Sequence, residues 1–213
     1  MNENQRTAQW YAARTGKLTA SRAYAAVARS KRDGKKLKAY TDLLAEIIAE
    51  RVTGIPVQHF VSEAMQWGID HEDEAIECYE TETGNVVKQV GFVFHPGIEN
   101  LGASPDGFVG EDGLIEVKCP STLNHLERLQ TREIPEQYKV QMQVQLICTA
   151  RRWCDFVDYD PRLSDEWAGG RLLILRYEPK PEELQETLKL CEEFLAEVDK
   201  KLSALANVVK AAA

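Results

Sequence analysis

The hydrophobic pattern of this 213-residue chain changes its period near residue 86, and that change limits the folds open to it. In residues 38–52 and 62–83, apolar side chains recur at helical spacing, which predicts two helices. Gly54 and Gly84 follow these stretches and are expected to end them. From residue 86 onward, β-branched and aromatic runs lie between turn residues, which predicts strands. Helices followed by strands favour a mixed sheet covered by helices.

The predicted elements fill the rest of the chain. The predicted strands are residues 86–95, 101–104, 108–109, 114–119, 153–159 and 172–177. The further predicted helices are residues 121–129, 135–150 and about 182–208. The apolar stripe of the last helix suits either core packing or an oligomer contact. With no internal repeat and no long linker, residues 1–213 are predicted to form one α/β domain, a mixed β-sheet flanked by helices.

Charge is distributed unevenly along this chain, whose formal net charge is −8. Residues 14–38 contain nine basic residues and one acid, a local charge of +8, so the rest of the chain carries −16. A basic arm of this kind can neutralise nucleic-acid phosphates, and it can equally be a solvated loop with no partner. The negative net charge therefore does not exclude a nucleic-acid ligand.

The composition predicts a cytoplasmic protein. No apolar run approaches the roughly 18 residues that a membrane helix needs, and residues 1–14 lack the apolar core of a signal peptide. The five cysteines are scattered, and no two of them have CxxC spacing. We therefore expect reduced thiols rather than a disulfide framework, a structural zinc site or an iron–sulfur cluster.

A Pro-Asp-Gly motif at Asp106 precedes a Glu-Val-Lys motif that begins at Glu116. Because side chains alternate along a strand, Glu116 and Lys118 share one face. Ile115 and Val117 share the opposite face, which we predict to be the buried one. An antiparallel hairpin between the two motifs would bring Asp106 beside the other two polar side chains.

Such a set of side chains suits the hydrolysis of a phosphodiester. Two carboxylates that lie close together repel one another, and a divalent cation relieves the repulsion. Oxygen ligands alone favour Mg²⁺, which activates a bound water and shields charge on the phosphate. Lys118 would then orient or deprotonate the water, or stabilise the transition state. The alternative is a solvated Glu–Lys pair on an ordinary strand.

The chain resembles the PD-(D/E)xK nucleases, and among them the phage lambda-type alkaline exonucleases (the YqaJ-like viral recombinases). The resemblance runs from about Arg14 to about Arg162. Six ordered motifs at compatible spacings carry it, and together they are more specific than any one of them. They are 14–21 (RTGKLTAS), Trp67-Gly68 with Glu72 and Ala75, 104–107 (SPDG), 116–120 (EVKCP), Tyr138 with Gln141 and Gln143, and 159–162 (YDPR).

The resemblance implies a restriction-endonuclease-like core and a metal centre. It implies that Asp106, Glu116 and the Val117 carbonyl bind Mg²⁺, with Mn²⁺ as a substitute. It assigns Lys118 as the catalytic lysine. Glu72 would help to hold a second metal ion or its water, and the alternative for Glu72 is a surface acid on a helix.

The resemblance also implies a site for the 5′-phosphate of a DNA end. Its residues would be Arg14, Ser21, Ser104 and Gln141. An arginine fork and hydroxyl donors suit a phosphate dianion. Met65 matches a position that wedges the duplex apart, and ordinary core packing is its alternative. The sequence does not decide whether Trp10 and Tyr11 stack on bases or pack under the first helix.

The implied activity is that of a double-strand-specific 5′→3′ exonuclease, which releases 5′-mononucleotides and leaves a 3′ single-stranded overhang. The resemblance further implies a homotrimeric ring around DNA and a single-strand annealing recombinase as partner. One alternative is another PD-(D/E)xK enzyme, such as a repair nuclease with an iron–sulfur cluster, against which the scattered cysteines argue. The other is a non-catalytic DNA-end-binding module, against which the intact Asp106, Glu116 and Lys118 argue.

Overall fold

The fold is described here from a computed structural model, which covers residues 5–58 and 60–212. The remaining positions of the predicted single domain, 1–4, 59 and 213, lie outside the described residues. The helices are α1 (Ala8–Arg14), α2 (Ala20–Val27), α3 (Lys38–Thr53), α4 (Glu63–Thr83), α5 (Thr122–Thr131), α6 (Glu136–Thr149) and α7 (Pro181–Ala212), with a 3₁₀ helix η1 (Asp165–Gly170). The strands are β1 (Leu18–Thr19), β2 (Val87–Lys88), β3 (Val93–Phe94), β4 (Leu101–Ala103), β5 (Gly107–Val109), β6 (Gly113–Lys118), β7 (Trp153–Tyr159) and β8 (Leu172–Tyr177).

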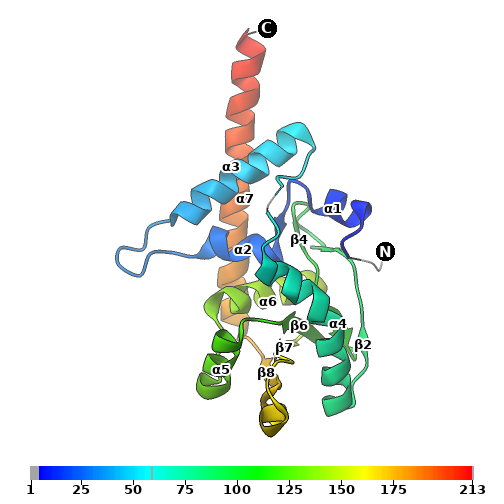
Figure 1. The fold of residues 1–213 in the computed structure, drawn as a ribbon. Helices are drawn as coiled ribbons and strands as arrows, with labels where there is room; N and C mark the ends of the chain where they lie inside the picture. Colours follow the sequence, from blue (N-terminus) through cyan, green and yellow to red (C-terminus); the bar gives the residue numbers. More distant parts are fainter. Residues whose placement is uncertain (1–4, 59, 213) are drawn as a thin grey trace.

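The main sheet has five strands in the order β2-β5-β6-β7-β8. Strands β6 and β7 are parallel, and the other neighbours are antiparallel. The connection from β6 to β7 carries α5 and α6, as a parallel pair requires. Figure 1 shows the sheet in the lower half of the molecule, with α4 and α6 packed around it. The predicted mixed sheet flanked by helices is confirmed, and the bounds predicted for β7 and β8 match those of the structure.

The predicted burial of the Ile115 and Val117 face of β6 is confirmed, but the opposite face is covered as well. Ile115 and Val117 pack in a cluster with Tyr79 of α4. On the opposite face, Leu114 packs against Met142 of α6. A central strand that pairs in parallel has helices on both sides, and alternation along its sequence does not show this. On the carboxylate-bearing face of β6, Leu114 and Glu116 are therefore buried, while Lys118 at the strand end is partly exposed.

The predicted strand 86–95 is in fact two short strands in two sheets. Strand β2 pairs with β5 in the main sheet, and β3 pairs with β4 in a second sheet of order β1-β4-β3. Strand propensity indicates that a segment is extended but not which strand it pairs with, so the sequence predicted one strand where the structure has two. The chain returns to the main sheet between β4 and β5, and Asp106 lies in that return. The change of sheet thus positions the first acidic residue of the motif.

Helix α4 begins and ends where its capping residues predict. The Ser62 hydroxyl accepts a hydrogen bond from the Met65 N–H, and Gly84 ends the helix with a left-handed φ of 68°. Met65 and Ile69, the first apolar side chains of the helical pattern in residues 62–83, are 53% and 37% exposed. Helical spacing predicted the right face for the later turns of α4, whereas its first turns border a cavity instead of the core.

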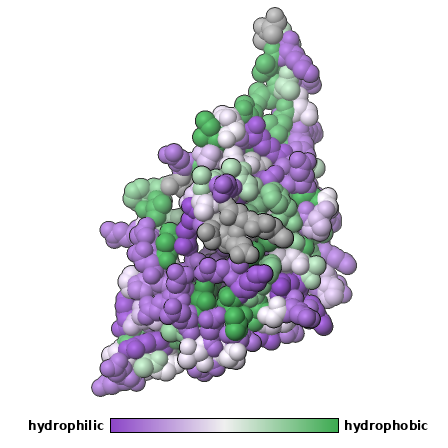
Figure 2. Space-filling model, turned by 90° about the vertical axis from the view of Figure 1, so that its right-hand side faces the viewer, coloured by the Kyte–Doolittle hydropathy of each residue, from purple (hydrophilic) through white to green (hydrophobic). Residues whose placement is uncertain are grey.

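Helix α7 is longer than the predicted 182–208 and extends past the body of the molecule (Figure 1). Its first half packs into the core through Cys191, Phe194 and Val198. Leu205, Val208 and Val209 near its end are exposed, and hydrophobic and hydrophilic residues mix along this projection (Figure 2). Across residues 5–58 and 60–212, no helix combines the length and the apolar character that crossing a membrane requires.

Candidate active site

Asp106 and β6, the central strand of the main sheet, meet where the chain enters β5. The Asp106 carboxylate accepts a hydrogen bond of 2.6 Å from the Val117 N–H. Strand β5 pairs with β6 so that Gly107 lies opposite Ile115, which brings Asp106 alongside Glu116. The structure therefore brings together Asp106, Glu116 and Lys118, the three side chains that the two motifs predicted to converge.

Glu116 is held by three donors from two elements. Its side chain is 1% exposed. Gln141 Nε2 donates to Oε1 at 2.6 Å, and Gln145 Nε2 donates to Oε2 at 2.5 Å. Lys118 Nζ also contacts Oε1. The buried carboxylate is therefore fixed in one orientation before any ligand binds.

Gln145 is a site residue that the sequence reasoning missed. It lies four residues after Gln141 on α6, so the two amides share a helical face. That spacing was the available signal. Gln143, two residues away, faces elsewhere and donates to the Tyr177 hydroxyl, as the same spacing argument predicts. Gln141 was predicted as a phosphate ligand, yet in this structure its amide contacts the Glu116 carboxylate.

Lys118 bridges two of the predicted metal ligands. Its ammonium contacts Glu116 and donates to the Val117 carbonyl oxygen at 3.1 Å. Burial alone would lower the pKa of Lys118, but the charges of Glu116 and Asp106 outweigh it, and the pKa is raised above its ordinary value. The side chain therefore stays an ammonium at neutral pH. In this state it suits charge stabilisation and donation better than proton abstraction.

The surroundings of Asp106 disfavour its ionised form. Withdrawal from water raises the pKa of Asp106 well above its ordinary value, and the charges of Glu116 and Glu72 add to the increase. Asp106 forms no ion pair with any residue that the structure describes. A site that disfavours the ionised form of Asp106 is one that a bound cation would stabilise.

The donor set fits a hard cation that keeps several waters. Among residues 5–58 and 60–212, no three His, Cys, Asp or Glu side chains converge closely enough to hold an ion by themselves. The oxygens that do converge are those of Asp106, Glu116 and the Val117 carbonyl. The Lys118 ammonium already contacts a Glu116 oxygen and the Val117 carbonyl oxygen, so it occupies the position that a metal ion would take. Mg²⁺ takes one or two carboxylates and completes its shell with water and phosphate.

Glu72 approaches this centre from α4. Together with Asp73 and Asp106 it lines a cavity of about 330 Å³. Its carboxylate pairs with the Arg6 guanidinium at 2.5 Å. Glu72 thus lies at a cavity that Asp106 also lines, and its charge contributes to the raised pKa of Asp106.

Arg14, Ser21 and Ser104 form one polar cluster. Arg14 Nη1 donates to Ser104 Oγ and Nη2 donates to Ser21 Oγ, both at 3.2 Å. The guanidinium lies 4.0 Å from the centroid of the Trp10 ring, so Trp10 packs beneath it. Burial, and then the charge of Arg22, lower the pKa of Arg14 to about 10. A cation so poorly compensated by its surroundings suits an anionic ligand.

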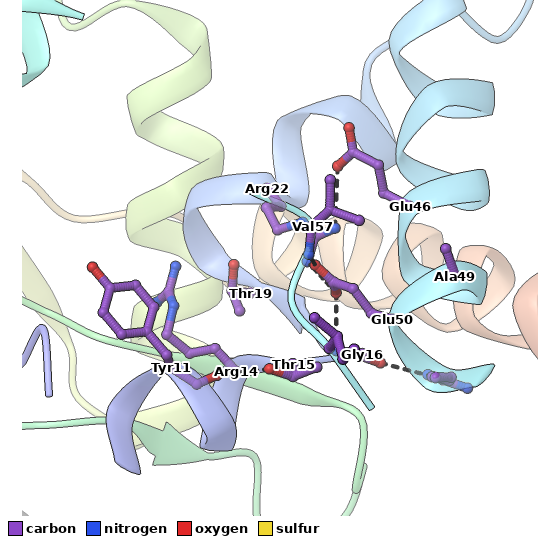
Figure 3. A network of polar contacts seen from close by, with 12 residues as sticks. Tyr11, Arg14, Thr15, Gly16, Thr19, Arg22, Glu46, Ala49, Glu50 and Val57 are labelled. Carbon is purple, nitrogen blue, oxygen red and sulfur yellow. Dashed lines mark hydrogen bonds and ion pairs between the residues drawn. The ribbon is translucent and has the colours of Figure 1, made fainter. Parts of the chain in front are cut away.

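A second network fixes the backbone around Arg14. The buried Glu50 carboxylate of α3 accepts hydrogen bonds from the Gly16 and Val57 N–H groups, at 2.9 and 3.2 Å, and it pairs with Arg22 at 2.9 Å. Figure 3 shows these contacts converging on Glu50 from three segments of the chain. Gly16 has a left-handed φ of 72°, and a Cβ there would lie 2.7 Å from Arg51 Cγ. Only glycine fits this turn without strain.

A large cavity joins these groups. It measures about 1110 Å³, and Arg14, Ser21, Met65 and Gln141 line it. Because Gln141 also donates to Glu116, α6 connects this cavity to the acidic centre. The basic stretch 14–38 does not form one arm: it includes the end of α1, all of α2 and a hairpin with a bridge between Arg29 and Lys36.

The fold and this site define an α/β nuclease, and comparisons with known proteins agree. A family model described as the YqaJ-like viral recombinase domain matches residues 9–152. The crystal structure of an alkaline exonuclease, LHK-Exo, from Laribacter hongkongensis is 39% identical, with a TM-score of 0.89, and covers 97% of this chain and 100% of its own. The same values hold for LHK-Exo in complex with dAMP.

A phage-related exonuclease from Haemophilus somnus 129PT has 16% identity and a TM-score of 0.60, with 89% of this chain and 96% of that chain covered, and so shares the fold. No match was found among curated protein sequences. The chain belongs to the YqaJ-like viral recombinase family, whose model spans more than half of it. With the alkaline exonuclease at 39% identity, this makes it a DNA exonuclease.

Proposed function

We propose that this protein is a Mg²⁺-dependent exonuclease for double-stranded DNA. It would degrade one strand in the 5′→3′ direction, release 5′-mononucleotides and leave a 3′ overhang for recombination by single-strand annealing. One observation carries the proposal: Gln141 lines the cavity that holds Arg14 and Ser21, and it also hydrogen-bonds Glu116. The side chain of Gln141 thus connects the proposed phosphate-binding residues with Glu116, a proposed metal ligand.

Asp106, Glu116 and the Val117 carbonyl would hold Mg²⁺, or Mn²⁺ in its place, and Glu72 would hold a second ion or its water. When bound, such ions acidify water and shield charge on phosphate oxygens. The fixed orientation of Glu116 by Gln141 and Gln145 supports this assignment, because ligands held by neighbouring donors bind metals more tightly.

The other proposed roles belong to side chains around the two cavities. Lys118, as an ammonium, would stabilise charge on the phosphoryl oxygens of the scissile bond. Arg14, Ser21 and Ser104 would bind the terminal 5′-phosphate, aided by the N-terminus of α2 next to Ser21. The exposed Met65 at the cavity wall would separate the end base pair.

We further propose a homotrimeric ring around DNA, a single-strand annealing recombinase as partner, and a cytoplasmic location. The charge supports the ring: a chain of net charge −8 would bind DNA weakly as a monomer, and encirclement retains the substrate without broad electrostatic affinity.

The test is a time course on a linear duplex labelled at one 5′ end, with and without the terminal phosphate. Wild type should digest the linear duplex in Mg²⁺, spare it in EDTA, and spare circular DNA in both. Lys118→Ala should abolish hydrolysis and still bind DNA in a gel-shift assay. Digestion of circles, or activity in EDTA, would contradict the proposal.

Arg14→Ala tests the phosphate site. Losing charge-assisted hydrogen bonds of about 1.5–3 kcal/mol should lower kcat/KM on phosphorylated ends about ten- to hundredfold. Ends with a 5′-hydroxyl should lose little. Arg152→Ala is the matched control, because Arg152 is 79% exposed and pairs with Asp112 away from both cavities. An equal loss on both kinds of end would remove Arg14 from the phosphate site.

A further inference from the structure

Arg6 has a backbone conformation that its side chain does not favour. Its φ is 62°, in the left-handed region, where a non-glycine residue is strained by roughly 1 kcal/mol or more. The preceding Gln5 is anchored by two hydrogen bonds from its side-chain amide, to the Val90 carbonyl at 3.1 Å and to the Pro105 carbonyl at 2.8 Å. The segment is thereby held next to Asp106, and its strain is maintained at the edge of the acidic centre.

The Arg6 side chain uses this position to reach an acidic residue. Its guanidinium pairs with Glu72 at 2.5 Å, with side-chain exposures of 41% for Arg6 and 22% for Glu72. Arg6 lines the small cavity that contains Glu72, Asp73 and Asp106, and it lines the large cavity as well. Arg6 therefore places a positive charge beside the acidic residues that line the small cavity.

We propose that Arg6 is a built-in counter-ion that competes with the divalent cation for Glu72 and so sets the cation concentration the enzyme needs. This rests on the proposed function, in which Glu72 helps to hold a metal ion. A guanidinium bonded to a Glu72 oxygen occupies a ligand position, so a cation can take that oxygen only by breaking the Arg6–Glu72 pair. Cation binding and the Arg6–Glu72 pair are thus antagonistic, and by linkage the loss of one strengthens the other.

The experiment measures Mn²⁺ binding to the full chain by calorimetry, without DNA. Arg6→Gln removes the charge and keeps the length, while Arg6→Lys keeps the charge. We expect Arg6→Gln to lower the Kd for Mn²⁺ about two- to fivefold, the effect of losing a partly exposed ion pair. Arg6→Lys should stay near wild type, as should the exposed control Arg152→Gln.

A double-mutant cycle assigns the effect to Glu72. In a Glu72→Gln background, which should bind Mn²⁺ more weakly, Arg6→Gln should no longer change the Kd. Equal Kd values for wild type and Arg6→Gln, or the same gain in both backgrounds, would overturn the role of Arg6 while leaving the metal centre intact. If wild type and every variant bind no Mn²⁺, the proposed metal-dependent function fails, and this inference fails with it. Cooperative thermal unfolding, followed by circular dichroism, verifies that each variant is folded.

Discussion

Replacing Asp106 by Asn should make the protein more stable and inactive. The Asp106 pKa is raised well above its ordinary value of 3.8 by burial and by the charges of Glu116 and Glu72. Each unit of a raised pKa corresponds to about 1.4 kcal/mol of destabilisation at neutral pH. Asn keeps an oxygen for the Val117 N–H and carries no charge. We therefore expect a gain of at least about 1 kcal/mol without divalent cations, or about 2–4 °C in Tm at this chain length.

The pH dependence has a definite sign. Because the folded protein binds the Asp106 proton more tightly than the unfolded chain, wild type loses this part of its stability as pH rises from 3.8 towards the raised pKa. Asp106→Asn lacks that decline. The difference in Tm between the two proteins should grow across this window and stay constant above it.

Divalent cations should reverse the order of stability. Mg²⁺ at 100 times its Kd stabilises a protein by about 2.7 kcal/mol, which is about 5–11 °C here. Thermal melts in EDTA and in Mg²⁺, followed by circular dichroism, should show wild type gaining this shift and Asp106→Asn gaining none. A variant that melts below wild type in EDTA, or that keeps the full Mg²⁺ shift, would refute the electrostatic account of the site.

Two further predictions concern buried donors. Gln145→Leu removes one donor from Glu116, so it should destabilise the fold by about 1–3 kcal/mol and weaken Mn²⁺ binding in calorimetry; an unchanged Kd would contradict its proposed positioning role. His125 has Asp158 and the Gly170 carbonyl on its two ring nitrogens, and these outweigh burial to raise its pKa. The stabilisation that charged His125 gives to the folded state is therefore complete below pH 6.5 and is lost as pH rises through the raised pKa. His125→Gln should lower Tm by roughly 6–12 °C at pH 6, from about 3 kcal/mol, and by less at alkaline pH; a pH-independent loss would contradict the assigned charge.

The strands and helices were largely predictable, because their signals are local. Alternation along β6 and helical spacing in α4 follow from which neighbours a side chain meets two, three or four positions away. The division of residues 86–95 between two sheets was not predictable, since pairing depends on partners elsewhere in the chain. The same reason hid the second buried face of β6, which α6 covers.

The candidate site likewise has residues that the sequence predicts and supporting contacts that it does not. Asp106, Glu116 and Lys118 could be expected from two adjacent motifs, and the resemblance supplied Arg14, Ser21 and Ser104, which the structure brings into contact. The contacts of Glu50 and Arg6, unlike those of Gln145, lacked any local signal. Glu50 reaches Gly16 across 34 positions, and Arg6 reaches Glu72 across 66, so only the folded chain reveals them.

The most direct measurement of the central claim is a crystal grown or soaked in Mn²⁺ and examined by anomalous scattering. The account predicts an anomalous peak in contact with the Asp106 and Glu116 carboxylates and the Val117 carbonyl, with the Lys118 ammonium displaced from Glu116. A crystal with no peak there, in a protein that still digests duplex ends, would contradict it.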